Sequence, residues 1–417
     1  MTIEDSIGVA LQVDPVVRSH ETRKETAALE LRRSRRWLPS NPYVNTSVSS
    51  STFERTSGGD ELAPETERAG PAFTFFLEQQ FDLAGQRSIR IESAELAANI
   101  AELNRLHARN NLAARVKTAF TVALMRREIS RLEQETFHWE GQAMEAWEQD
   151  PRRSLAVDVG RTNAETRLWR ARRARQYVSR AYAKALAELR NLLRLPADTA
   201  IELEGTLPYD FEPPAEVESL IARGRSQRAD LQAQSLLAQW SELQVKLARR
   251  NIVPTIALSG FVSHEDGEQQ FGGGIGFPLP IFDHPGYEIR SATIDLDKTR
   301  AELAAAEQRV ATEIRAAHAD LLAESEDGRI LRDEILPRLR RIAAGRDQLF
   351  DAGQGGSAEI INAELEVVEA RRDLVDAAAD YAVARIELER VVAAPLSAPI
   401  EQSGPAAADQ QNSGTGD

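Results

Sequence analysis

The sequence predicts a mainly α-helical protein with a small β part, made of two similar halves. The strands of several copies of the chain are expected to combine into one closed sheet. Three observations carry this prediction. Motifs recur in the same order in both halves, two very long segments are almost free of helix-stopping residues, and four short segments alternate apolar and polar side chains. Charged residues make up 28% of the 417 residues, and arginines and glutamates are mixed in helical segments, as on solvated helix faces.

The internal repeat is visible in short motifs. Arg35-Arg36 and the following Trp37–Pro42 lead into an alternating segment, as Arg249-Arg250 and Asn251–Pro254 do in the second half. Each half is expected to run helix, strand, loop, strand, very long helix, turn, helix. We therefore predict a first repeat at 1–196, a linker at 197–213, a second repeat at 214–395 and a disordered tail at 396–417, rich in Ala, Gly, Pro, Gln and Ser.

The long helices are predicted from the positions of proline and glycine. From Gln86 to Asp150 there is no proline, and Gly141 is the one glycine. A helix of about 60 residues would be about 90 Å long. The matching segment from Tyr287 to Asp351 contains Pro337, so we expect a bend there rather than an end. Each long helix is as long as two of the shorter helices placed end to end beside it.

The last helix indicates how these helices pack, because its apolar residues fall on two adjacent seams with coiled-coil spacing. One seam contains Val367, Ala370, Leu374, Ala377, Tyr381, Ala384, Leu388 and Val391, and the other contains Ile361, Leu365, Val368, Val375, Ala379, Ala382 and Ile386. Two seams let a helix contact a neighbour on either side, as in a curved wall. An ordinary helical bundle core remains open as the alternative.

Four segments alternate in polarity and are predicted strands, at about 42–53, 72–83, 254–264 and 270–282. They form two hairpins, and each segment has the length of a tilted strand that crosses a bilayer. The side chains expected to face lipid are Phe73, Phe75, Leu77, Phe81, Phe271, Ile275, Phe277, Leu279 and Ile281. A half-buried sheet of a soluble protein is the alternative, but isolated hairpins leave open edges. Four strands are too few for a barrel, so several copies are expected to pool their strands.

The layout and three local motifs resemble one known family. The motifs are Thr2–Ile7 at the start, Trp37–Pro42 before the first strand, and Glu78–Arg87 after the second. They resemble the TolC-like outer-membrane efflux proteins, the exit ducts of tripartite pumps in Gram-negative bacteria, and especially the heavy-metal cation efflux branch. The resemblance covers about residues 2–395. It implies a trimer in which a twelve-stranded transmembrane β-barrel is continuous with an α-barrel that crosses the periplasm.

The resemblance also implies a gate and a docking end at the helical tips. In the family, acidic side chains of three subunits approach the axis there, and the matching positions are Asp158, Glu359 and Asn362, so one carboxylate of the pattern is replaced by an amide. Charged rings of this kind favour cation passage. Asp158 and Glu359 would also suit the first turn of a helix through its dipole, and this alternative stays open. The positions expected to meet a periplasmic adaptor are Ser154, Leu155, Gly353, Gly355, Gly356 and Ser357. Both serines are expected helix N-caps.

Other functions are less well supported. The net charge of −14 opposes nucleic-acid binding, and the absence of cysteine excludes thiol catalysis and thiolate metal sites. Gly272–Gly276 lacks the residues of a phosphate loop, and His264-Glu265-Asp266 is a weak metal candidate. No nucleophile–base arrangement or metal motif occurs. We therefore predict no enzyme activity, no cofactor and no metal site.

These observations favour a passive outer-membrane exit duct that works as a homotrimer with a periplasmic adaptor and an inner-membrane transporter. The cargo would be heavy-metal cations or organic compounds. Met1–Asp5 lacks the features of a secretory signal, which taken literally indicates a cytoplasmic protein. We instead expect the outer membrane and the periplasm, with a signal peptide upstream of Met1 or lost. The alternative is a soluble or periplasmic structural or adaptor protein made of long coiled coils.

Overall fold

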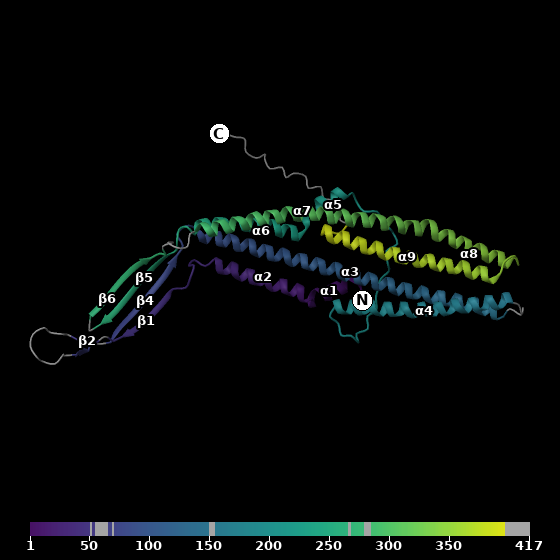
Figure 1. Cartoon of the computed structure of the whole chain (residues 1–417), viewed down its shortest axis with the longest axis horizontal. Helices are drawn as coiled ribbons and strands as arrows, with labels where there is room; N and C mark the ends of the chain where they lie inside the picture. The colour runs from purple at the N-terminus through teal and green to yellow at the C-terminus, as the bar shows by residue number, and fades with distance from the viewer. Residues whose placement is uncertain are drawn as a thin grey trace, which may run out of the picture.

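The computed structural model describes residues 1–50, 52–54, 66–68, 71–149, 155–265, 268–278 and 285–396. It is a long bundle of helices with a small sheet at one end (Figure 1). The helices are α1 (Ile3–Val13), α2 (Pro15–Ser34), α3 (Gln86–Glu148), α4 (Leu155–Leu192), α5 (Val217–Gln227), α6 (Ala229–Arg250), α7 (Pro285–Arg329), the π-helical turn η1 (Ile330–Ile335), α8 (Leu336–Asp351) and α9 (Ser357–Val392). Within the described residues, no helix is both long enough and apolar enough to cross a membrane.

The helices form a wall with a constant order. In the half nearer the sheet, α2 packs on α3, α3 on α6, and α6 on α7. In the far half, α4 packs on α3, α3 on α9, and α9 on α8. Short helices therefore lie end to end beside the long ones, as the sequence predicts. The wall has free edges at α2 and α4 on one side and at α7 and α8 on the other.

The long helices agree with the positions of proline and glycine. Helix α3 has 63 residues, which corresponds to about 94 Å. The second long helix is interrupted at the predicted place, because Pro337 stands at the start of α8 and the π-turn η1 precedes it. There the Leu336 amide donates to the Leu331 carbonyl, five residues back. Proline lacks the amide and its ring clashes with the carbonyl four residues back, so the local bonding shifts while the helix continues.

Both predicted seams of α9 are confirmed as packing surfaces. Val367, Leu374, Tyr381 and Leu388 on one seam and Ile361, Val368, Val375 and Ala379 on the other are buried. Helix α9 packs against α3, α7 and α8, so it has neighbours on both sides. Ion pairs add to the α3–α9 contact: Arg371 lies 2.6 Å from Glu135, and Arg372 lies 2.8 Å from Glu133.

The strands form one antiparallel sheet in the order β1-β4-β5-β6. They are β1 (Tyr43–Ser49), β4 (Ala72–Phe81), β5 (Ile256–Glu265) and β6 (Glu268–Gly276). The central pairing of β4 with β5, in which Phe76 lies opposite Phe261, joins the hairpins of the two halves. The predicted first strand is too long, because β1 ends at Ser49 and the separate ribbon of β2 (Thr52–Glu54) and β3 (Thr66–Arg68) follows. The predicted fourth strand begins and ends too late, since β6 is complete at Gly276.

The predicted linker is an extended segment that packs tightly across the middle of the wall. Residues 196–216 contain no helix or strand, yet Ile201, Leu203, Leu207 and Phe211 are buried. Arg127 of α3 donates to the carbonyls of Leu203 and Gly205, and Tyr381 of α9 donates to that of Glu212. We call residues 196–216 the strap. It binds helices of both halves, while the repeat boundaries at 1–196 and 214–395 stay predictions.

Candidate functional site

The end of the wall farthest from the sheet is a pair of helical tips. In the turn between α8 and α9, Gly353 has φ +73°, in the left-handed region where glycine is favoured. The Gly353 amide donates to the Phe350 carbonyl and the Gln354 amide to that of Leu349, both at 2.8 Å. A Cβ at Gly355 would lie 3.4 Å from the Phe350 nitrogen. Gly353 and Gly355 thus permit the tight reversal that the sequence predicts.

The predicted N-cap at Ser357 is wrong. Gly356 has the extended N-cap conformation, and Ser357 is the first residue of α9. The helix starts without a side-chain cap, because the glycine before it supplies the conformation but no oxygen. Ser154 lies outside the described residues. Leu155 begins α4, and its side chain also lies outside them.

The three predicted gate residues lie at or near the tips. Asp158 is exposed in the first turn of α4. Glu359 is in the first turn of α9, and its Oε2 lies 2.6 Å from the Arg346 guanidinium of α8. Both positions also suit the helix dipole, so that interpretation remains available. Asn362 lies one turn further along α9.

Arg167 of α4 joins the two helix pairs at this level. Its Nη1 donates to Asn362 Oδ1 at 3.1 Å, and its Nε donates to Glu140 Oε1 of α3 at 3.0 Å. The Glu140 side chain is about 10% exposed, and its Oε2 is buried without a hydrogen-bond partner among the described residues. The α3/α4 and α8/α9 pairs of one subunit are therefore linked through one guanidinium, which we call the Arg167 clamp.

Helices α3 and α4 approach closely beside this clamp. The Trp147 ring of α3 lies over Gly160 of α4, where a Cβ would be 2.5 Å from the nearest ring carbon. A pocket of about 390 Å³ next to it reaches α9 and is lined by Trp147, Arg167, Ile361 and Asn362 among others. The seam between the two helix pairs is therefore incompletely filled near the tips.

The sequence points to Asn362 but not to Arg167, Glu140 or Arg346. The partners in the clamp are 27 and 195 residues apart, so no local spacing reveals them. Arg346 and Glu359 are 13 residues apart across the tip turn, and that turn could have suggested the pair. Among the described residues, Asp158 makes no hydrogen bond or ion pair with Glu359 or Asn362, whose polar partners are Arg346 and Arg167.

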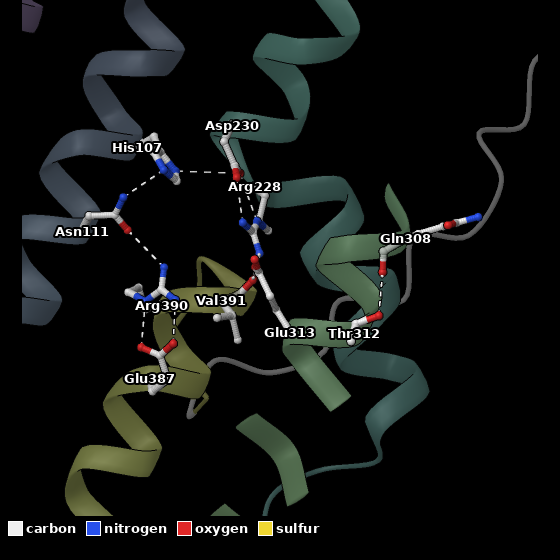
Figure 2. A network of polar contacts seen from close by, with 10 residues as sticks. All are labelled: His107, Asn111, Arg228, Asp230, Gln308, Thr312, Glu313, Glu387, Arg390 and Val391. Atoms are coloured by element: carbon white, nitrogen blue, oxygen red, sulfur yellow. Dashed lines mark hydrogen bonds and ion pairs between the residues drawn. The ribbon is translucent and has the colours of Figure 1, made fainter. Parts of the chain in front are cut away.

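A second polar cluster lies at the middle of the wall, away from the tips (Figure 2). Arg228, between α5 and α6, donates to both oxygens of Asp230 at 3.0 and 2.7 Å, and to Glu313 of α7 at 2.6 Å. Figure 2 shows His107 and Asn111 of α3 approaching the same cluster from the opposite side. Asn111 Nδ2 lies 2.9 Å from His107 Nε2, and its Oδ1 accepts from Arg390 of α9. The cluster therefore ties four segments together.

The charges in this cluster shift one another's protonation. Burial lowers the pKa of His107 below its ordinary value, and although Asp230 acts in the opposite direction, Arg228 and Arg390 reinforce the shift. Burial alone would raise the pKa of Asp230, but the hydrogen bonds from Arg228 outweigh it and lower that pKa. The cluster is most stable with His107 neutral and Asp230 ionised.

The sheet has two unlike faces. The pairings Phe75–Val262 and Val262–Phe271 place three apolar side chains in a row on one face. Many predicted lipid-facing residues are exposed here: Phe73 (51%), Phe75 (47%), Leu77 (43%), Phe271 (86%), Ile275 (69%) and Phe277 (56%). Phe81 is partly covered and makes an edge contact with Trp37. Leu279 and Ile281 lie outside the described residues.

The described residues contain no group of three or more His, Asp or Glu side chains that could hold a metal ion. His264, the weak metal candidate of the sequence analysis, lies on β5 opposite Phe73 and Gln269.

Comparisons with known proteins agree with this architecture. Residues 220–394 match the protein-family model described as outer membrane efflux protein. No curated protein sequence matches the chain significantly. Among solved structures, CusC has a TM-score of 0.71 at 16% identity, with 94% of this chain and 91% of that chain covered. VceC of Vibrio cholerae has 0.71 at 15% identity, covering 94% and 96%. The open-state MtrE channel of Neisseria gonorrhoeae has 0.74 at 18% identity, covering 94% and 89%.

The solved structures share the fold along nearly the whole chain, and the family model covers most of the second half. These findings confirm the mainly α fold class with its small sheet, and they point to transport rather than to an enzyme. Residues 220–394 therefore match the outer membrane efflux protein family, and the chain as a whole has the fold of these solved outer-membrane channels.

Proposed function

We propose that the chain is the outer-membrane exit duct of a tripartite efflux system and conducts substrates passively to the exterior. The observation that carries the proposal is the sheet, which exposes phenylalanine, leucine and isoleucine on one face and has a mostly polar opposite face. An exposed apolar face of this kind is unstable in water and suits contact with lipid. The helical wall of about 94 Å attached to it would extend the duct through the periplasm.

In a homotrimer, the open sheet edges of each subunit would pair with those of its neighbours. Strands β1 and β6 are the outer strands of the four-stranded sheet. If β6 of one copy pairs with β1 of the next, three copies close a twelve-stranded barrel. Edge contacts between unlike surfaces close a ring when the rotation allows it.

The charges of the edge helices support the same arrangement. In the half nearer the sheet, basic residues outnumber acidic ones in the edge helix α2, whereas acidic residues outnumber basic ones in the opposite edge helix α7. Contact between α2 of one copy and α7 of the next would therefore be electrostatically favourable.

The Arg167 clamp is positioned to restrict the inner end of the duct. It ties Asn362 on α9 to α4, while Asp158 and Glu359 place carboxylates near the same end. Opening would require the two helix pairs of a subunit to separate, and the Arg167–Asn362 bond opposes that movement. Arg167→Ala and Asn362→Ala should each raise the fraction of time that the channel conducts in planar bilayers.

A matched control sharpens this experiment. Arg180 lies on the exposed side of α4, where, within the part of the chain that the structure describes, its side chain donates only to the carbonyl one turn back. Arg180→Ala therefore removes the same charge from the same helix without touching the clamp. If wild type, Arg167→Ala and Asn362→Ala conduct for the same fraction of time, the clamp is not part of the gate. If Arg180→Ala raises that fraction as much as Arg167→Ala does, surface charge is the cause instead.

The helical tips would dock a periplasmic adaptor, and an inner-membrane transporter would supply the energy. Leu155, Gly353, Gly355, Gly356 and Ser357 mark these tips, with Ser154 beside them in sequence. Heavy-metal cations and organic compounds remain the two candidate cargo classes.

The duct is tested by the behaviour of the purified protein. We expect a trimer in detergent that forms ion-conducting channels in planar bilayers. Phe75→Asp should abolish insertion, because a charge facing lipid costs about 2–4 kcal/mol. Thr74→Asp, on the adjacent residue and the opposite face, should be tolerated. A monomer that is soluble without detergent and forms no channels would instead favour a structural coiled-coil protein.

A further inference from the structure

The polar face of the sheet carries three aromatic side chains among small and polar residues. Tyr43 on β1, Phe76 on β4 and Phe261 on β5 share this face with small or polar residues. The neighbours on the same face are Asn45, Ser47, Thr74, Ser259, Ser263, Gly272 and Gly274. If the apolar face meets lipid, these three rings lie on the side of the conducting path.

The rings are arranged around a strip of small side chains. Phe76 and Phe261 are directly opposite each other on β4 and β5. The Phe76 ring makes an edge contact with Tyr43, with ring centres 6.4 Å apart. The Phe261 ring leans the other way, over Gly272 of β6, where a Cβ would be only 2.5 Å from a ring carbon. The two phenylalanines therefore lean apart, and the strip between them is lined by Thr74, Ser259 and Ser263.

A carboxylate lies on the same face beside these rings. Glu78 follows Phe76 by two residues on β4 and pairs in register with Tyr43 and Ser259. It is half-buried and has no ion-pair partner among the described residues. Aromatic rings next to an unpaired carboxylate attract an organic cation through the ring faces and through the opposite charge.

We propose that Tyr43, Phe76, Phe261 and Glu78 form a weak binding site for organic cations, in particular quaternary ammonium compounds, on the channel side of the sheet. The proposal rests on the proposed function, because the site faces the cargo only if the sheet is part of the duct. It favours organic cations over bare metal ions as cargo. Metal cations need several oxygen ligands, and among the described residues Glu78 is the one carboxylate beside these rings, because Glu268 of the same face lies four residues from Gly272 along β6.

The aromatic residues are poorly explained by sheet stability alone. Cross-strand aromatic pairs stabilise a sheet when their rings contact each other. Here only the Tyr43–Phe76 contact is of this kind, since the directly opposed rings of Phe76 and Phe261 lean apart, and Phe261 and Tyr43 remain 38% and 58% exposed. The same chain places its other exposed strand phenylalanines, Phe73, Phe75 and Phe271, on the apolar face.

Saturation-transfer NMR on the whole protein in maltoside detergent can detect such weak binding, with choline as the probe. We expect saturation transfer to choline and much less to its neutral analogue 3,3-dimethylbutanol. Phe76→Ser, Phe261→Ser and Glu78→Gln should each weaken choline binding about 3- to 10-fold, as expected for one cation–π or charge contact. Phe271→Ser makes the same change on the apolar face and should leave choline binding unchanged.

The outcomes separate this proposal from the proposed function. Equal transfer to choline and the neutral analogue, or unchanged binding in Phe261→Ser and Glu78→Gln, would overturn the site even if the protein forms channels in bilayers. Protein that forms no channels would overturn the duct itself. If a serine variant fails to assemble, Phe261→Leu keeps the apolar bulk but removes the ring, and retained choline binding in that variant would also overturn the site.

Discussion

Gly328 of α7 is where the strap meets the helical wall, and its replacement by alanine tests that contact. A Cβ at this position would lie 2.1 Å from the nearest carbon of the Phe211 ring. Phe211 has no free space to move into, because it is 1% exposed, packs at 5.4 Å against the Tyr381 ring and lies under the Arg332 guanidinium. Forcing a methyl group into a filled core costs about 1–3 kcal/mol.

The same substitution at Gly345 of α8 is the matched control. This glycine also lies within a helix, and a Cβ there would meet no atom within 4 Å. Alanine is preferred to glycine in a helix by about 1 kcal/mol, so Gly345→Ala should stabilise the protein. Gly328→Ala receives the same helix preference, so its net effect should be a loss of up to about 2 kcal/mol.

Denaturant unfolding of the detergent-solubilised protein, followed by circular dichroism, measures the difference. Limited proteolysis provides a second readout, since a displaced Phe211 should expose residues 196–216 to cleavage. A Gly328→Ala variant as stable and as protease-resistant as Gly345→Ala would show that the strap does not pack on α7 as described.

Three further predictions concern the clusters of the helical wall. Burial lowers the pKa of His107, so the unfolded chain binds a proton at this side chain before the folded chain does as the pH falls. The free energy of unfolding should therefore decrease from neutral pH to about pH 5. His107→Gln should flatten this pH dependence in thermal unfolding scans. Arg228→Met leaves Asp230 and Glu313 unpaired, and should cost about 2–3 kcal/mol after allowance for the partial exposure of the two carboxylates, measured by the same denaturant unfolding. Gly160→Val should push the Trp147 ring aside, and a change in tryptophan fluorescence with faster proteolysis near the tips would reveal it.

The long helices could be predicted because their signals are local. The absence of proline from α3 and the single proline of the second long helix set their continuity, whatever packs around them. The seams of α9 were readable for the same reason, since a helix keeps the same residues on one side along its whole length. The alternating strands also showed which face is apolar.

Contacts between distant segments could not be read in this way. The strap is a polar and proline-containing segment in the sequence, yet it places Phe211 in a gap that exists only because Gly328 lacks a side chain. The Arg167 clamp joins residues from three helices, and neither Arg167 nor Glu140 differs locally from the many other charged residues of those helices. Ser357 had the right residue type for an N-cap, but the helix begins one residue earlier than a serine cap would require.

The edges of the wall and of the sheet constrain each other. One subunit has outer strands β1 and β6 at one end, and outer helices α2, α4, α7 and α8 along the rest of its length. Strands and helices belong to one continuous chain, so in the proposed trimer the same three copies would have to close both the sheet and the helical wall. The junction between the sheet and the helical wall is short. Gln86, at the start of α3, is buried there and donates to the carbonyls of Arg250 and Val253, at and just after the end of α6. A change at that junction would alter the angle between sheet and wall, and would weaken both closures at once.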